Sequence, residues 1–130
     1  MPRVVTSTPK NSPTPIGPYN HIAQVGSSIT IGGVAGIDPA TGRLAGPTVT
    51  DQTRQILHNM DAFLQSVGSD LAHVVHVNVF LLRVSDFEEM NRAYAEPFGD
   101  HRPARTVFGV HELPKAGFLL TMNLTAVTRE

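Results

Sequence analysis

The sequence predicts an α+β protein in which two helices pack together on one face of a mixed sheet. Its 130 residues are enough for one hydrophobic core, so a single domain over residues 1–130 is expected. Two stretches have apolar residues at helical spacing, and several short apolar runs are separated by turn-forming residues. This arrangement leaves the other sheet face for water or for a partner.

The N-terminal part of the chain predicts an extended segment followed by hairpins. Residues 1–19 are rich in Ser, Thr and Pro and end in Ile-Gly-Pro-Tyr. Two short apolar runs within residues 21–31 flank a Gly-Ser-Ser sequence, and a third run around Ile37 precedes Asp-Pro-Ala-Thr-Gly at 38–42. Because proline and glycine favour tight turns, antiparallel strands joined by hairpins are expected here.

The first helix is predicted over residues 51–67. Thr50 or Asp51 is the expected N-cap, and Gly68 stands just past the end, where glycine favours helix termination. The apolar positions at helical spacing are Ile56, Met60, Phe63, Leu64 and Val67.

The second helix is predicted to begin at the sequence Ser-Asp-Phe-Glu at 85–88, which matches a capping box. Its apolar positions Phe87, Met90 and Tyr94 are expected to point inward. The helix should end before Pro97, because proline disfavours helical backbone at the preceding residue.

Three further strands are predicted. Residues 74–82 are nearly continuous β-branched and aliphatic sequence, which is typical of a central strand buried on both faces. A short strand is expected from Thr106 to Val110. Residues 118–127 alternate strictly, and the side expected to face the core comprises Phe118, Leu120, Met122, Leu124 and Ala126.

Composition excludes several classes of function. Ten Lys or Arg against eleven Asp or Glu, without a basic run, do not favour binding to nucleic acid or to a membrane surface. The absence of cysteine excludes disulfides, thiolate catalysis and iron–sulfur clusters. No stretch approaches the ~18 apolar residues needed to span a bilayer, so a cytoplasmic protein is expected.

No metal or cofactor site is predicted. His73 and His76 are three residues apart at the start of a strand, where odd spacing directs side chains to opposite faces, and the other histidines are scattered. Gly32 and Gly33 with Gly36 are not followed by a helix, so a bulge or a close approach to a ligand is expected rather than a dinucleotide loop. No Gly-x-Ser-x-Gly motif indicates a serine hydrolase.

Arg105 is the charged residue with the most informative surroundings. The sequence Pro-Ala-Arg-Thr-Val at 103–107 places its guanidinium at the start of a short strand among small and β-branched residues. Two interpretations remain open from spacing alone: a surface or salt-bridging arginine, and an arginine that binds a ligand.

Short motifs in a fixed order extend over nearly the whole chain. They are Ile16-Gly17-Pro18-Tyr19; Gly33 before the turn Asp38-Pro39-x-Thr41-Gly42; Asp86-Phe87 with Asn91; and Arg102-Pro103-Ala104-Arg105-Thr106 before Leu113-Pro114-Lys115. Together they resemble the successive signatures of the Rid family of small deaminases, also called the YjgF family. The resemblance implies a chorismate-mutase-like fold and a homotrimer, in which the sheets form a barrel-like core and each subunit interface holds a pocket.

The resemblance also implies roles for individual residues. Arg105 matches the arginine that clamps the carboxylate of an enamine or imine substrate in the deaminating members, for which planar bidentate pairing is suited. Other pocket residues implied by the family are Tyr19, Gly32, Gly33, Asn91, Thr106 and Val107.

The chain departs from the family pattern at several pocket positions. Thr121 stands where the deaminases usually have a glutamate that activates water, and Asn123 replaces a second acid. Gly32 stands where a serine is frequent, and Val107 where a cysteine is frequent. The chain between Asn91 and Arg105 is also shorter, so the pocket rim is expected to differ.

Three functions follow as hypotheses. The first is hydrolytic deamination of enamine or imine intermediates, of the 2-aminoacrylate type, to 2-oxo acids and ammonia. Thr121 is expected to hold the water, with Glu112 or His111 as a possible base from a loop. The second is a family member that binds a small carboxylate, or catalyses another reaction, without classical deaminase activity. The third is a trimeric scaffold in which Arg105 forms a salt bridge and Tyr19 belongs to the core.

Overall fold

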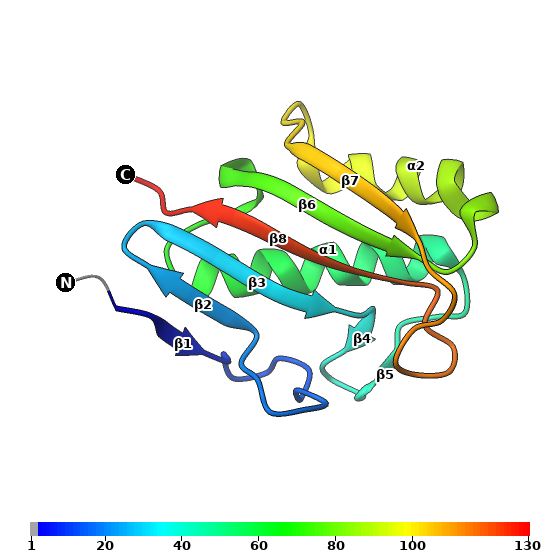
Figure 1. The fold of residues 1–130 in the computed structure, drawn as a ribbon, viewed down its shortest axis with the longest axis horizontal. Coiled ribbons are helices and arrows are strands. Elements are labelled where there is room, and N and C mark those ends of the chain that lie inside the picture. Colours follow the sequence, from blue (N-terminus) through cyan, green and yellow to red (C-terminus); the bar gives the residue numbers. More distant parts are fainter. Residues whose placement is uncertain (1–2) are drawn as a thin grey trace.

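The computed structural model describes residues 3–130, in which a six-stranded sheet lies in front of two helices (Figure 1). Residues 1 and 2, the start of the predicted extended segment, lie outside this range. The strands are β1 (Val5–Ser7), β2 (Ile22–Val25), β3 (Ser28–Val34), β4 (Ile37–Asp38), β5 (Arg43–Leu44), β6 (Val74–Leu81), β7 (Ala104–Gly109) and β8 (Leu120–Val127). The helices are α1 (Val49–Ser66) and α2 (Phe87–Phe98), each preceded or followed by short 3-10 turns, η1 (Leu71–His73) and η2 (Val84–Asp86).

The large sheet is mixed, as predicted. Its strand order is β1-β2-β3-β8-β6-β7, and β4 pairs with β5 in a separate hairpin. Strands β6 and β7 pair in parallel and are connected through α2, whereas all other pairs of the large sheet are antiparallel. Both helices cover the same face (Figure 1), which confirms the predicted α+β class.

The N-cap of helix α1 lies two residues before Thr50 and three before Asp51, the two predicted N-caps. Thr48 is the N-cap rather than Thr50 or Asp51: its backbone is extended, and its hydroxyl accepts a hydrogen bond from the Asp51 amide at 3.1 Å. The earlier start buries Val49 at 3% exposure. The Thr50 hydroxyl instead donates to Glu89 of α2 at 2.7 Å.

Helix α2 starts and ends differently from the prediction. Its N-cap is Asp86, which makes no side-chain capping bond, because Ser85 lies within the η2 turn that leads directly into the helix. The expected capping box is therefore wrong. Pro97 lies inside the helix rather than after it, because Phe98 is 6% exposed and packs on Tyr94 with 4.9 Å between ring centroids. Burial of Phe98 outweighs the loss of one backbone donor.

The inward face of α2 also needs one correction. Met90 and Tyr94 are buried as predicted, whereas Phe87 is 38% exposed. The Phe87 ring lies at the surface beside Arg105, with 5.7 Å between its centroid and the guanidinium carbon. The first turn of α2 thus reaches beyond the core to the outer strand β7.

The three later strands differ from expectation mainly at their ends. Strand β7 starts at Ala104, because parallel pairing with β6 begins at the Ala104–His76 pair, and it ends at Gly109 rather than Val110. Strand β8 starts at Leu120, yet Phe118 is still buried, and the predicted alternation is confirmed by its burial pattern.

Strand β6 is central, but only one of its faces is buried. Val74, Val77, Val79 and Leu81 face the helices, whereas the side chains on the other face are partly exposed. No layer of the described chain covers that face. The prediction of burial on both faces is therefore wrong for the single chain.

The uncovered sheet face has its own ordered contacts across strands. The Asn78 amide donates to the Asn123 side chain at 3.0 Å, and Phe80 stacks on Phe108 with 5.2 Å between centroids. His76 lies 3.2 Å from the Thr106 hydroxyl. These pairs follow from the β8–β6–β7 register and form a partly apolar, partly polar surface.

Asp70 connects the η1 turn to the C-terminal end of the chain. It accepts hydrogen bonds from His73 at 2.7 Å and from Arg129 at 3.0 Å. The His73 bond holds the pKa of the Asp70 carboxyl below its usual value, and the Arg129 bond acts in the same direction against the opposing effect of burial. A depressed folded-state pKa stabilises the fold above the unfolded-state pKa, and this contribution is lost as pH falls through the folded value.

We therefore expect Asp70→Asn to lower the free energy of unfolding at pH 7 by up to about 1 kcal/mol, and to have no such effect at an acid pH below the depressed pKa of the Asp70 carboxyl. Urea titrations at the two pH values measure both quantities, with Asp100→Asn as the control because Asp100 is exposed and lies outside this network. Equal losses at both pH values would assign the effect to packing rather than to charge.

Candidate functional site

The predicted site residues fall into two places in the chain. Tyr19, Gly32, Gly33 and Thr121 line a cavity of about 360 Å³, here called the tyrosine cavity. Asn91 and Arg105 line a hollow of about 400 Å³ between α2 and β7, here called the arginine hollow. Thr106 and Val107 follow Arg105 along β7 and line neither the tyrosine cavity nor the arginine hollow.

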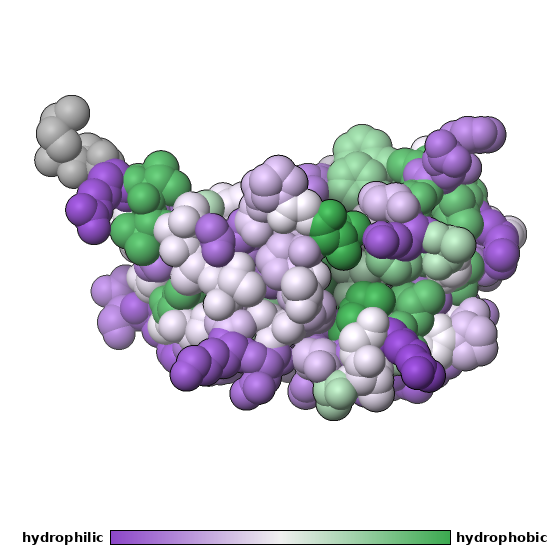
Figure 2. Space-filling view, turned by 90° about the horizontal axis from the view of Figure 1, so that it is seen from below, coloured by the Kyte–Doolittle hydropathy of each residue, from purple (hydrophilic) through white to green (hydrophobic). Residues whose placement is uncertain are grey.

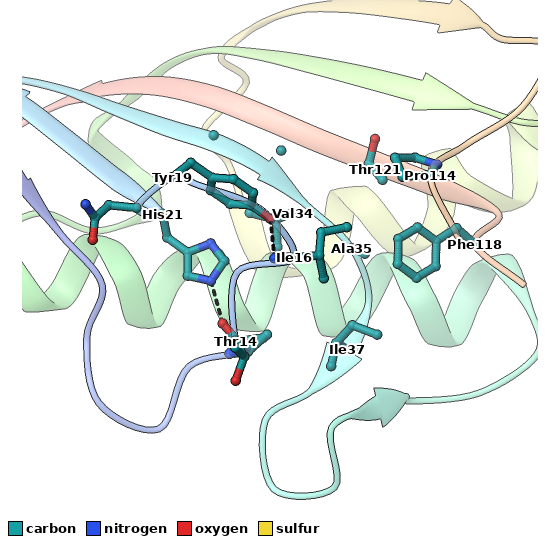
Figure 3. A pocket seen from close by; sticks show the side chains of 14 residues that line it. Thr14, Ile16, Tyr19, His21, Val34, Ala35, Ile37, Pro114, Phe118 and Thr121 are labelled. Atoms are coloured by element: carbon teal, nitrogen blue, oxygen red, sulfur yellow. Dashed lines mark hydrogen bonds between the residues drawn. The ribbon is translucent and has the colours of Figure 1, made fainter. Parts of the chain in front are cut away.

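The tyrosine cavity lies between the N-terminal segment and the end of β3. Figure 3 shows Tyr19 and His21 on one side of it and Pro114, Phe118 and Thr121 on the other. The Tyr19 hydroxyl accepts a hydrogen bond from the Ile16 amide at 3.1 Å, which holds the ring over the cavity.

Two glycines leave room for a ligand in this cavity. The register of β3 against β8 shifts between Ile31 and Val34, so Gly32 and Gly33 occupy an irregular stretch, as the sequence predicted. A Cβ added at either glycine would meet nothing within 4 Å. A side chain at either position would therefore extend into the cavity without a clash, and glycine leaves this space to a ligand.

The walls of the tyrosine cavity are mainly apolar. The lining includes no Asp, Glu, Lys or Arg. The apolar residues are Pro13, Ile16, Val34, Ala35, Ile37, Pro114 and Phe118. The face seen in Figure 2 shows hydrophobic side chains gathered around a hollow on the half of the molecule where β4 and β5 lie. Polar chemistry in the cavity is limited to hydroxyl groups, amides and one imidazole.

That imidazole, His21, was not singled out by the sequence. It is 5% exposed, stacks on Phe63 with 4.7 Å between centroids, and donates from Nε2 to the Pro13 carbonyl at 2.6 Å. Its Nδ1 has no hydrogen-bond partner among residues 3–130. The only sequence signal was its position two residues after Tyr19. His21 anchors the segment that forms one cavity wall.

Arg105 extends from β7 toward α2 in the arginine hollow. Its guanidinium carbon lies 4.8 Å from the Tyr94 ring centroid and 5.7 Å from that of Phe87. Such contacts orient an arginine without occupying its N–H donors. Within the described chain, Arg105 forms no ion pair and no side-chain hydrogen bond, so its donors are available to a ligand.

Two buried polar atoms beside Arg105 also lack partners. The Asn91 side-chain oxygen and the Tyr94 hydroxyl have no hydrogen bond within residues 3–130. Burial raises the pKa of Tyr94 to about 12, although Arg105 and Arg102 oppose this shift. The Tyr94 hydroxyl therefore stays protonated at neutral pH and can donate to an anion. The sequence indicated Tyr94 only as a core residue and did not single out Arg102.

The tyrosine cavity and the arginine hollow are separate in one chain. Strands β8 and β6 lie between β3 and β7, which at ~4.8 Å per strand step separates them by roughly 14 Å. Arg105 pairs with Val77 on the helix side, whereas Thr121 pairs with Phe80 on the open side. One small ligand cannot contact both residues of the same chain.

The two loop residues expected to act as a general base lie in neither the tyrosine cavity nor the arginine hollow. Glu112 and His111 are exposed and line neither the tyrosine cavity nor the arginine hollow.

His73 and His76 have different partners, Asp70 and Thr106. Across residues 3–130, three or more metal-binding side chains do not come together at any point. In the same range, neither helix is both long and apolar enough to cross a membrane.

Comparison with known proteins identifies relatives along nearly the whole chain. The family model described as Endoribonuclease L-PSP matches residues 9–128. A RutC family protein of Pyrococcus horikoshii is 43% identical over 106 residues, covering 82% of this chain and 84% of that protein. A human 2-iminobutanoate/2-iminopropanoate deaminase is 38% identical over 113 residues, covering 87% and 82%. The crystal structure of the YjgF gene product from E. coli has a TM-score of 0.89 at 31% identity, covering 96% and 99%.

Proposed function

The chain belongs to the Rid family, also called the YjgF family, and from this we propose that it deaminates reactive enamine or imine intermediates by hydrolysis. The substrates would be of the 2-aminoacrylate type and the products 2-oxo acids and ammonia. Relatives at 36–38% identity that are named imine deaminases support this chemistry. Although the matching family model is described as a ribonuclease, the chain has a net charge of -1 and no basic run for RNA.

The observation that carries the proposal is the unpaired guanidinium of Arg105. It is partly buried, stacked between Phe87 and Tyr94, and unpaired within the described chain. A salt-bridging role, as in the scaffold hypothesis, would require an acidic partner. A planar carboxylate is the ligand that best matches two parallel N–H donors. We infer that Arg105 binds the substrate carboxylate, with Asn91 and Tyr94 as neighbouring polar groups.

The complete site is proposed to form between copies of the chain in a homotrimer. The arginine hollow of one copy would face the tyrosine cavity of the next, which would join Arg105 to Tyr19 and Thr121. The uncovered sheet face with Phe80 and Phe108 would lie in the central core of the trimer. Light scattering should then give a mass three times the 14.0 kDa of the chain; a monomer would overturn this part of the proposal.

The proposed reaction requires little from the protein beyond orientation. The enamine tautomerises to an imine, and water adds to the C=N carbon while the π electrons and a proton go to nitrogen. The resulting carbinolamine loses ammonia as its O–H proton is removed and the C=O bond forms. General acid–base help typically contributes ~10²- to 10⁴-fold, so a cavity without a carboxylate near Thr121 slows this reaction without excluding it.

A second candidate is supported by the same cavity. Because neither Asp nor Glu lines it, the chain would bind a small carboxylate, or act in another reaction, without classical deaminase turnover. The resemblance to the family implies that Thr121 and Asn123 stand where other members usually have acids. The two candidates differ in one measurable property, the release of ammonia.

The test is ammonia release from 2-aminoacrylate generated in situ by a dehydratase acting on serine. We expect wild-type chain to accelerate release above the spontaneous rate, and Thr121→Glu to increase it by about 10- to 100-fold, because the carboxylate supplies a base. Gln65→Glu is the control, because Gln65 is exposed on α1, away from the uncovered sheet face, and does not line the cavity. No release by wild type, with gain only in Thr121→Glu, would favour the binding protein.

A further inference from the structure

The arginine hollow contains a second guanidinium, that of Arg102. The hollow is lined by Asn91, Tyr94, Ala95, Arg102, Pro103 and Arg105. Both arginines line the hollow together with Tyr94, and their positive charges lower the pKa of Tyr94 against the larger, opposite effect of burial. The deamination chemistry proposed above uses only Arg105, so Arg102 needs a separate explanation.

Arg102 is held in place by the backbone at the end of α2. Its Nη1 donates to the carbonyls of Gly99 and His101, the latter at 3.1 Å. Gly99 has a positive φ of 62°, which turns the chain sharply after the helix. The Nε and Nη2 donors of Arg102 have no partner within residues 3–130. Nη1 thus anchors the side chain, and Nε and Nη2 can still donate hydrogen bonds to a ligand.

The charged side chains that line the hollow are all positive. No acidic residue lines it, and neither Arg102 nor Arg105 forms an ion pair in the described part of the chain. Two like charges in one hollow repel each other, and an anion relieves that repulsion. Tyr94, which lines the same hollow at 7% exposure, has a buried hydroxyl without a hydrogen-bond partner within residues 3–130. The hollow therefore fits a ligand with more than one negative charge.

We propose that Arg102 forms a second anion subsite beside Arg105, and that the preferred ligands are dicarboxylates. This inference rests on the proposed function and names its substrate class: imines derived from acidic amino acids. Arg105 binds the carboxylate next to the imine carbon, and Arg102 binds the side-chain carboxylate. Hydrolysis adds one water and releases one ammonia, which converts the 2-imino diacid to a 2-oxo diacid.

A purely structural role for Arg102 makes a different prediction. If Arg102 only caps the carbonyls at the end of α2, its loss lowers stability and affects all ligands equally. A second subsite instead changes the preference between ligands with one and two carboxylates. The ratio of two dissociation constants therefore separates the roles, because a general loss of folded protein cancels in it.

The experiment is calorimetric titration of the full chain with 2-oxoglutarate and with 2-oxobutanoate, which are stable product-type probes. We expect wild type to bind 2-oxoglutarate about tenfold more tightly, because one additional charge-assisted contact is gained. Arg102→Gln should bring the ratio close to one. Arg54→Gln is the control: Arg54 is exposed, pairs with Glu96 and lies outside the hollow, so the ratio should stay near ten.

The outcomes separate this inference from the proposed function. A wild-type ratio near one, or a ratio that persists in Arg102→Gln, overturns the second subsite. If 2-oxobutanoate still binds in an Arg105-dependent way, the proposed function survives that result. If neither probe binds to wild type, both proposals are overturned.

Discussion

Replacing Arg105 by alanine should reduce affinity for 2-oxobutanoate, and ammonia release from 2-aminoacrylate, by about 100-fold or more. Two charge-assisted hydrogen bonds to a carboxylate are lost, each worth about 1.5–3 kcal/mol. The fold should persist, because Arg105 is only partly buried and has no ion pair in residues 3–130. Only its stacking on Phe87 and Tyr94 is lost, at about 1 kcal/mol or less.

Two variants make this test specific. Arg105→Lys keeps the charge but not the planar fork, so an intermediate loss of binding is expected. Arg54→Ala removes an exposed arginine that does not line the hollow and should leave both quantities within twofold of wild type. Isothermal titration and the coupled ammonia assay provide the measurements. An Arg105→Ala chain that binds and turns over like wild type would refute the role assigned to this residue.

Replacing Gln52 by leucine should destabilise the fold by about 3–5 kcal/mol. Its side chain is fully buried and joins two loops: Nε2 donates to the Gly46 and Gly117 carbonyls at 3.1 and 3.0 Å, and Oε1 accepts from the Leu119 amide at 2.9 Å. Leucine has a similar volume but leaves three backbone groups unpaired, each costing about 1–3 kcal/mol. Such a loss is a large fraction of the ~5–15 kcal/mol typical of a domain.

The same change should also affect the tyrosine cavity. Gln52 holds the backbone on both sides of Phe118, which is part of the cavity wall. Urea unfolding measures the stability loss, and Gln65→Leu is the matched control because Gln65 is exposed on the same helix. A difference below about 1 kcal/mol between the two variants would mean that the three hydrogen bonds contribute little net stability.

The elements predicted correctly are those in which apolar residues recur at a regular helical or strand spacing. The core of α1, with Ile56, Met60 and Phe63 at helical spacing, and the alternation of β8 both match the burial pattern. Their ends were less predictable. Thr48 and Thr50 are both reasonable caps, and burial of Val49 decides between them. Likewise, packing of Phe98 on Tyr94 extends α2 through Pro97, against its local preference.

Part of the candidate site could also be predicted from the sequence. Arg105, Tyr19, Asn91, Gly32, Gly33 and Thr121 were identified by motif resemblance, and each lines the tyrosine cavity or the arginine hollow. His21 and Arg102 were assigned no role: His21 was one of the scattered histidines, and Arg102 belonged to the motif at 102–106 without a function of its own. Their significance depends on burial, on unpaired atoms and on neighbours far along the chain.

The sequence by itself determined the α+β class, the order of the elements, the core faces of α1 and β8, and the family. These depend on local periodicity and on short motifs, which are properties of neighbouring residues. Only the tertiary structure decided that the site residues divide between two faces of the sheet, that Arg105 lacks a partner within the described chain, and that Arg102 shares its hollow. Those facts depend on strand order, register and burial, through which residues distant in sequence are brought together or kept apart.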